Sequence, residues 1–315
     1  LSLVELLSGD YSSGWKNHQW RWKIKDAKQP HAMPNIQEWQ GEQLQVREQL
    51  LVISEQGLGD TIHFMRYIPL LRQRGVDVAF CAQTKLHSLI KASNIDDSPL
   101  TPEQANLVTE GKWIPLLSLP RHLDVSPQNV IIAKPYVSAT DSLINKWKKI
   151  LSKESRPIIA INWQGNPSME KTYQGRSIPL EIFSILFKQN DIKLLSLQKG
   201  FGTEQLDNCS FKEQFVDCQK EVDAIWDFLE MAAIIMNCDL IITSDTSVAH
   251  LAGALGKKTW LLLHHVPDWR WGVKDKKTFW YPSMKLFRQT SRNEWKGMME
   301  QVAIQLEGFF TNHLE

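Results

Sequence analysis

The sequence lacks the features that would assign it at once to a specialised class of protein. Its 315 residues include only four cysteines, none in a C-x-x-C pair, which favours reduced, mostly structural thiols in a cytoplasmic protein. No apolar run reaches the length of a membrane span, no signal peptide is visible, and no H-E-x-x-H motif or other metal cluster occurs. The formal net charge of +1 provides no basic excess, so we expect no nucleic-acid partner.

Short apolar runs alternate with helical patterns along most of the chain, which predicts parallel sheets covered by helices. In the first half, strands are expected at 51–53, 76–81, 113–119 and 130–133, with a helix near 84–92. In the second half, strands are expected at 158–163, 192–197, 215–217, 240–243, 259–263 and 284–287. The other helices are expected at 141–155, 179–188, 222–237, 246–255 and 292–310, and a Pro-containing linker at 28–40.

Two turns stand out, each directly after a predicted strand. The first, EQGLGDTI at 55–62, places Gly57, Gly59 and Asp60 before a helix start, where unpaired N–H groups suit an anion and glycines admit a close neighbour. The second is the SDTSVAH turn at 244–250. Open α/β sheets bind ligands at the carboxyl ends of their strands, so both turns are site candidates. The alternative for the first turn is a common G-x-G turn with an Asp that only caps the helix.

The run SDTSVAHLAGALGKKTWLLL at 244–263 resembles the donor-binding segment of the ADP-heptose glycosyltransferases, glycosyltransferase family 9. Asp245, Thr246 and His250 match the D-T-G-x-x-H pattern of that family, and Ser247 stands where the family has glycine. The run EQGLGDTIHFMRYIPLL resembles the family's N-terminal L-G-D turn, whose Asp is the proposed catalytic base, and Asp60 takes that position.

A closer resemblance is to large bacterial proteins in which tetratricopeptide repeats are fused to such a domain. The shared motifs are G-D-Y-x-x-G-W-x-x-x-x-W-R-W at 9–22, E-Q-G-L-G-D-T-I at 55–62, R-S-I-P-L at 176–180, S-L-Q-K-G at 196–200 and P-D-W-R-W at 267–271. This resemblance implies that residues 1 to about 25 are the end of a repeat array and that a protein partner acts through upstream repeats.

The alternation and the resemblance together imply an α/β protein of the GT-B class, with two Rossmann-like domains facing across a cleft. We expect a helical segment and linker at 1–45, an acceptor-side domain at 46–140, a bridge at 141–155, a nucleotide-sugar-binding domain at 156–290 and a C-terminal helix at 291–315. The resemblance also implies a nucleotide-diphosphate sugar as donor and no tightly bound metal or cofactor, so that cations and helix termini hold the phosphates.

The phosphate-binding set implied in this way consists of Gly57, Gly59, Arg176, Lys199, Asp245, Thr246, Ser247 and His250. Arg176 resembles the family's cationic donor-site Lys and suits bidentate phosphate binding, although a surface salt bridge is the alternative. Asp245 binds a sugar or ribose hydroxyl or caps the helix, and His250 faces the phosphates or is a structural hydrogen bonder.

Two weaker groups complete the predicted site. Trp226 and Asp227 resemble the family's adenine-side segment, where Trp226 either stacks on the base or belongs to the core. Asp268, Trp269 and Arg270 lie in the loop HHVPDWRWG at 264–272, which either contacts the donor or acceptor or only clamps itself to the protein.

Three functions are compatible with this pattern. The first is an inverting, metal-independent glycosyltransferase whose acceptor is a glycan, lipid or protein. The second is a catalytically inactive GT-B-like binding or scaffold module working with tetratricopeptide repeats. The third is a nucleotide-sugar epimerase or another GT-B-shaped enzyme that needs no acceptor. Product analysis separates them, because only a transferase makes a new glycoside.

Overall fold

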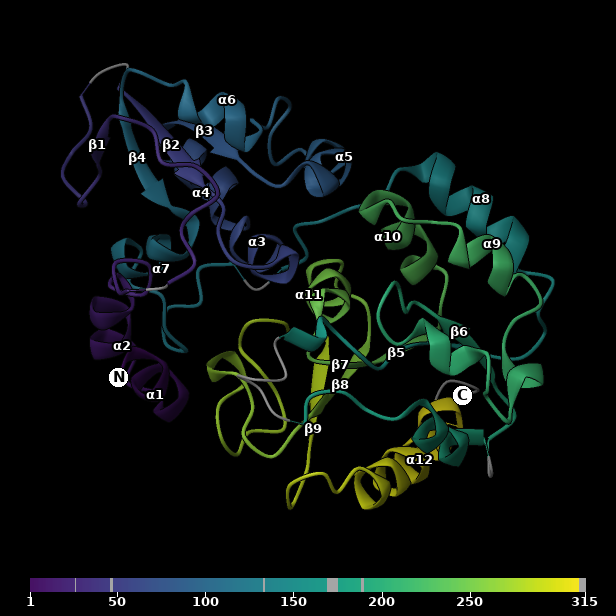
Figure 1. Cartoon of the computed structure of the whole chain (residues 1–315). Helices are drawn as coiled ribbons and strands as arrows, with labels where there is room; N and C mark the ends of the chain where they lie inside the picture. Colours follow the sequence, from purple (N-terminus) through teal and green to yellow (C-terminus); the bar gives the residue numbers. More distant parts are fainter. Residues whose placement is uncertain (26, 46–47, 133, 169–174, 188–189, 312–315) are drawn as a thin grey trace.

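The structure, a computed structural model, describes residues 1–25, 27–45, 48–132, 134–168, 175–187 and 190–311, and contains two separate sheets (Figure 1). The first sheet has the order β1-β4-β2-β3, with strands Gln37–Glu38, Lys112–Pro115, Gln49–Ile53 and Asp77–Cys81. The second has the order β6-β5-β7-β8-β9, with strands Lys193–Ser196, Ile158–Asn162, Leu240–Ser244, Thr259–Leu263 and Met284–Arg288. All of these pairings are parallel, so the predicted α/β organisation with two parallel sheets is confirmed.

The central strands of the second sheet are buried at every position, as expected for a parallel sheet covered on both faces. Strands β5, β7 and β8 have the near-continuous apolar sequences IIAIN, LIITS and TWLLL. This pattern explains why these strands were readily predicted from the sequence.

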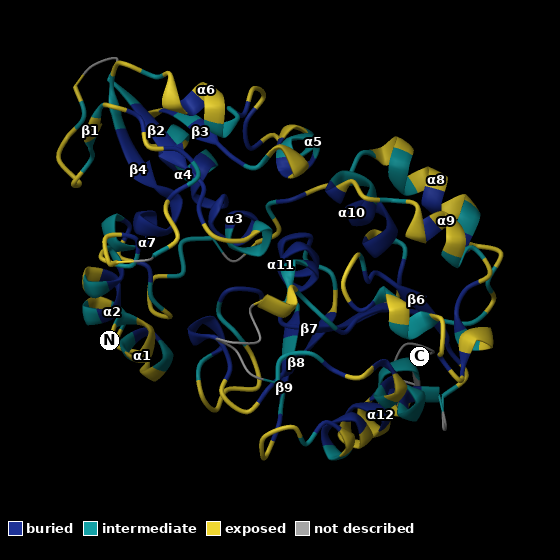
Figure 2. Ribbon diagram, in the orientation of Figure 1, coloured by how far each residue is buried: buried dark blue, intermediate teal, exposed yellow. Residues whose placement is uncertain are grey.

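Helices cover the sheets, and helices also form the N-terminal and C-terminal parts of the described chain. The first half contains α1 (Ser2–Ser8), α2 (Tyr11–His18), α3 (Leu58–Phe64), α4 (Tyr67–Gln73), α5 (His87–Ala92), α6 (Pro102–Asn106) and α7 (Leu119–His122). The second half contains α8 (Asp141–Leu151), α9 (Gln219–Asp223), α10 (Phe228–Met236), α11 (Ser247–Ala254) and α12 (Lys296–Thr311). Figure 2 shows that α11 is buried, whereas α8 and α12 carry exposed outer faces.

Two predicted strands are wrong. Residues 130–132 form no strand, because Ile131 has a φ of 57°, in the left-handed region that interrupts extended chain, and residue 133 lies outside the described residues. The predicted strand at 215–217 is reduced to one isolated bridge between Phe215 and Leu194.

Helix predictions in the second half also need correction. The helix predicted at 222–237 is divided into α9 and α10, because Asp227 has extended backbone (φ −83°, ψ 133°) and stands at the N-cap position of a new helix. The segment predicted as a helix at 179–188 is a 3-10 helix over Leu180–Phe187, with residue 188 outside the described part. The predicted linker at 28–40 includes the short edge strand β1.

The two halves of the chain meet at α3 and α11, which lie side by side in the centre of Figure 1. Because α3 follows β2 and α11 follows β7, the carboxyl ends of these two strands are directed toward one another. One hydrophobic cluster includes residues of both halves, such as Phe64 and Ile68 with Ala249 and Leu251.

A buried arginine, Arg66, makes hydrogen bonds to residues of both halves. Its Nε donates to the carbonyl of His63 (2.7 Å), and its Nη1 donates to the carbonyls of Trp280 (2.9 Å) and Ile132 (3.1 Å). The guanidinium also lies 4.7 Å from the ring centre of Tyr281. One side chain therefore connects α3, the segment around Ile132 that leads from the first half to the second, and the loop before β9.

Candidate active site

Asp60 lies in the first turn of α3, where the chain changes direction after β2. Its Oδ2 accepts a hydrogen bond from the N–H of Gly57, the N-cap residue, at 2.9 Å. Its Oδ1 accepts from the guanidinium of Arg270, which comes from the other half of the chain. Gln56, just before the turn, has a φ of 60°, so the backbone is held in an unusual conformation beside this carboxylate. Asp60 thus caps its helix and also faces the other half.

Gly59 is in direct contact with the start of α11. A Cβ on Gly59 would lie 2.9 Å from Cδ2 of His250 and 3.3 Å from Cα of Ser247. Because Gly59 has no side chain, α11 packs directly against it, and the space beside Gly59 is filled by this helix and is not open to a ligand. The two turns marked in the sequence lie against each other, and where a cleft was expected the halves touch.

Arg270 is the centre of a buried charge network. Its Nη1 donates to Oδ1 of Asp268 at 2.8 Å, its other terminal nitrogen pairs with Asp60, and its guanidinium lies 4.5 Å from the ring centre of Trp269. Burial opposes the charged form, but Asp268 and Asp60 outweigh it and raise the pKa of Arg270 above its usual value. A fixed cation therefore lies next to the carboxylate of Asp60.

Asp245, at the end of β7, is buried beside the same network. Burial and the negative charge of Asp268 raise its pKa to about 6, while the positive charges of Arg176 and Arg270 oppose this shift. Arg176 is therefore close enough to Asp245 to act on it. The Nη2 of Arg176 also lies 2.6 Å from the position of a Cβ on Gly165, so Gly165 leaves room for the guanidinium.

Thr246 occupies the N-cap position of α11 without a capping hydrogen bond from its side chain, and a chain of polar residues at the carboxyl ends of the second sheet holds it. Its hydroxyl donates to Oδ1 of Asn162 at 2.8 Å, and the amide of Asn162 donates to Gln198 at 2.9 Å. Methyl Cγ2 of Thr246 lies 3.5 Å from the Cβ position of Gly165. The start of α11, at Thr246 and Ser247, is thus next to Arg176, where N–H groups and a cation suit a phosphate.

His250 is a structural hydrogen bonder in this structure. Its Nδ1 lies 2.9 Å from the hydroxyl of Tyr281, which also lies 2.8 Å from Nδ1 of His63, and its ring stacks on Trp271 at 5.5 Å. Burial, together with the positive charges of Arg270 and Arg66, holds the pKa of His250 well below its usual value. The imidazole is therefore neutral and brings no positive charge to a phosphate.

Two predicted site residues, Lys199 and Asp227, make their contacts elsewhere, and a third, Trp226, is exposed. The ammonium of Lys199 donates to the carbonyl of Val222 at 2.6 Å, and burial lowers its pKa. Asp227 accepts from the hydroxyl of Ser88 at 2.6 Å across the two halves. Trp226 is 64% exposed, so it is not a core residue and its ring is available to a planar ligand.

Trp269 offers no surface to a ligand in this structure, which favours the alternative that it clamps its loop to the protein. Its side chain is 4% exposed and packs edge-on against Trp15, with ring centres 5.3 Å apart, and near Trp280 at 6.2 Å. Trp269 clamps its loop onto the N-terminal helices, whereas its neighbours Asp268 and Arg270 make the polar contacts of the site.

Sequence analysis missed several residues that support the site. Among them are Arg66, His63, Tyr281, Asn162 and the buried pair of Arg21 with Glu55. An available signal was Arg66 itself, a lone arginine in the otherwise apolar run HFMRYIPLL, because a buried arginine needs hydrogen-bond partners.

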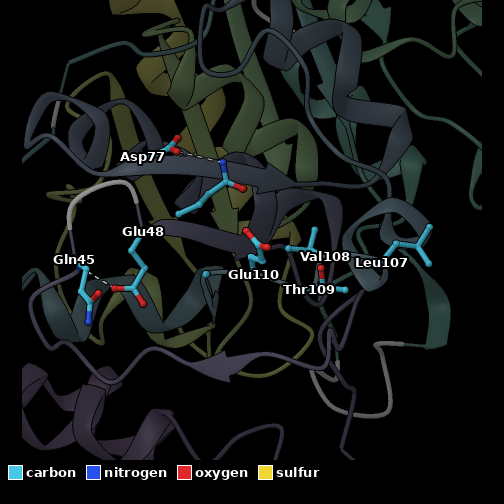
Figure 3. A pocket seen from close by; sticks show the side chains of 9 residues that line it. Gln45, Glu48, Asp77, Leu107, Val108, Thr109 and Glu110 are labelled. Carbon is cyan, nitrogen blue, oxygen red and sulfur yellow. Dashed lines mark hydrogen bonds between the residues drawn. The ribbon is translucent and has the colours of Figure 1, made fainter.

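A cavity of about 610 Å³ lies at the opposite, amino edge of the first sheet (Figure 3). Its lining includes Glu48, Asp77 and Glu110, so the negative charge disfavours a phosphate. In the part of the chain that the structure describes, no group of three or more His, Cys, Asp or Glu side chains is placed to hold a metal ion. None of the described helices is long and apolar enough to cross a membrane.

Comparison with known proteins finds similarity in one part of the sequence and in the overall fold. Residues 135–266 match the model of glycosyltransferase family 9 (heptosyltransferase). A solved glycosyltransferase family 9 protein from Veillonella parvula is similar with a TM-score of 0.55 and 12% identity, over 90% of this chain and 99% of that chain. ADP-heptose lipopolysaccharide heptosyltransferase II from E. coli is similar with a TM-score of 0.55 and 11% identity, over 85% of this chain and all of that chain.

These structural similarities confirm the GT-B-like fold, and the match to the family 9 model covers residues 135–266. Protein FlbA of Caulobacter vibrioides is 21% identical over 335 residues, which cover 97% of this chain. The chain spans about half the length of that curated relative (54%).

Proposed function

We propose that this chain transfers a sugar from a nucleotide-diphosphate donor to an acceptor hydroxyl with inversion at the anomeric carbon. In this step the acceptor oxygen forms the new bond to the anomeric carbon and gives its proton to the carboxylate of Asp60. The bond between the anomeric carbon and the phosphate oxygen breaks, and the nucleoside diphosphate leaves with the electron pair.

The observation that carries this proposal is the contact between the two turns. Asp60 of α3 lies against the start of α11, where Gly59 touches Ser247, and Arg176 lies beside Asp245 and Thr246. A candidate base and a candidate phosphate site are therefore adjacent although they come from different halves. The carboxylate of Asp60 accepts two hydrogen bonds and has lone pairs left for an acceptor hydroxyl.

Arg176, the start of α11 and the nearby Arg270 supply the positive charge that the leaving diphosphate needs, so the proposed transfer uses no tightly bound metal. We take ADP as the donor nucleotide because the similar E. coli protein is named as an ADP-heptose heptosyltransferase. In this proposal residues 156–290 bind the donor, with Trp226 stacking on its base, and residues 46–140 bind a glycan, lipid or protein acceptor. We also propose that residues 1 to about 25 are the end of a repeat array, as the motif at 9–22 implies, and that the protein acts in the cytoplasm.

Donor binding is tested by thermal melting with ADP and ADP-heptose. A ligand at about 100 times its dissociation constant stabilises the folded state by about 2.7 kcal/mol, which raises the melting temperature by roughly 5 °C in a chain of this size. We expect Asp60→Asn to keep this shift and Arg176→Ala to lose most of it. Arg74→Ala, at an exposed position on the first half, is the matched control. A full shift in Arg176→Ala contradicts the phosphate site.

A second candidate is a binding or scaffold module, and the pairing of Asp60 with Arg270 favours it, because the candidate base is already neutralised. Incubation with ADP-heptose and an acceptor extract decides between the two. A transferase forms a new glycoside and loses about 10²-fold or more of its rate in Asp60→Asn, whereas a scaffold binds nucleotide and forms no product. An epimerase returns an altered nucleotide sugar.

A further inference from the structure

The motif at 9–22 has no role in the proposed chemistry, yet it makes specific contacts with the rest of the protein. Asp10 caps α2 by accepting from the N–H of Ser13 at 3.0 Å. From this helix, Trp15 donates its indole N–H to the carbonyl of Val125 at 2.7 Å, and its buried ring packs edge-on against Trp269. The helix is therefore held in a defined orientation on the loop that contains Arg270.

Arg21, just beyond the same helix, makes a second contact of this kind. Its Nε donates to Oε2 of Glu55 at 2.8 Å, and a terminal nitrogen pairs with the other carboxylate oxygen. Glu55 is 1% exposed, and its Oε1 also accepts from the N–H of Leu117 at 3.0 Å. Glu55 stands directly before Gln56, whose φ of 60° begins the turn that leads to Asp60.

These two contacts reach both partners of the same ion pair. Through Glu55 the N-terminal segment holds the start of the turn that carries Asp60. The N-terminal segment also holds Arg270, because Trp15 packs on Trp269, whose ring centre lies 4.5 Å from the guanidinium of Arg270. The two partners come from different halves and are 210 residues apart, so a third segment that contacts both restricts their relative position. In Figure 1, α1 and α2 lie beside the loops that precede β9.

We infer that Trp15 and Arg21 are positioning residues for the Asp60–Arg270 pair, so that the N-terminal segment is part of the active enzyme. This inference rests on the proposed function. Because a misplacement of about 1 Å can reduce a rate by up to roughly 10²-fold, loss of either contact lowers turnover without removing a group that touches substrate. Donor binding by Arg176 and the start of α11 lies outside these contacts.

The test uses the full chain with two conservative substitutions, Trp15→Phe and Arg21→Lys. The matched control is Trp20→Ala, because Trp20 belongs to the same motif but is 57% exposed. Hydrogen–deuterium exchange is measured on peptides covering 55–62 and 266–272, below the melting temperature of every variant. Release of ADP from ADP-heptose in the presence of the acceptor extract gives kcat and KM for the donor.

We expect both substitutions to speed exchange in both peptides and to lower kcat about 10-fold, with KM for the donor within about 2-fold of wild type. Trp20→Ala should leave all three quantities unchanged. An unchanged kcat in both variants overturns the inference, and so does faster exchange in only one of the two peptides. A wild type that releases no ADP refutes the proposed function. In that case the hydrogen–deuterium exchange of the two peptides alone tests whether Trp15 and Arg21 hold the Asp60–Arg270 pair, and unchanged exchange overturns the inference as well.

Discussion

Replacing Arg270 by methionine removes the cation on which the site network depends. The guanidinium is 7% exposed, donates to Asp268 at 2.8 Å, pairs with Asp60 and lies next to the buried Asp245. Methionine keeps an unbranched apolar stem against Trp269, so packing changes little while the charge is lost. Removal of one partner from a buried ion pair leaves an uncompensated charge and costs about 3–5 kcal/mol. The partial exposure of Asp60 favours the lower end of this range.

The assay is equilibrium unfolding in urea at pH 7, followed by tryptophan fluorescence, because Trp269 lies directly under Arg270. Arg74→Met, at an exposed position, is the control and should change the unfolding free energy by less than about 0.5 kcal/mol. Adding Asp268→Asn to Arg270→Met should restore about 1–2 kcal/mol, since one of the unpaired carboxylates is then neutral. A loss below about 1 kcal/mol in Arg270→Met, or no recovery in the double variant, refutes the network as described.

Three further predictions concern the same region. Gly59→Ala should destabilise by about 1–3 kcal/mol in urea unfolding because its methyl group would overlap α11, whereas Gly308→Ala, with open space around it in α12, should be neutral or slightly stabilising. Asp245 binds its proton more tightly in the folded state, where its pKa is about 6 instead of 3.8. As the pH rises from 4 to 6, the unfolding free energy of the wild type should therefore fall relative to that of Asp245→Asn, and parallel pH profiles would contradict this. Gly165→Ala should leave stability within about 0.5 kcal/mol but displace the guanidinium of Arg176, which occupies the position of the added methyl group, and so weaken ADP binding, measured by calorimetry; unchanged affinity would remove Arg176 from the site.

Local features of the fold were predictable because their causes are local. The apolar runs that became β5, β7 and β8 are buried on both faces, so their sequences are continuously hydrophobic. The turn at Gly57 to Asp60 was also predictable, since glycines and a helix-capping carboxylate mark such a turn directly. Where prediction failed, at 130–132 and at the break before α10, single residues with particular backbone angles decided the outcome.

The sequence alone therefore determined the alternation of strands and helices, the class implied by the family motifs, and the two turns that carry the candidate site residues. Only the tertiary structure decided which of these residues meet. It pairs Asp60 with Arg270, packs Gly59 against α11 and buries Trp269 under the N-terminal helices. Such contacts join residues far apart in the chain, and they depend on how two sheets and a terminal segment pack together, a property that local sequence patterns do not encode.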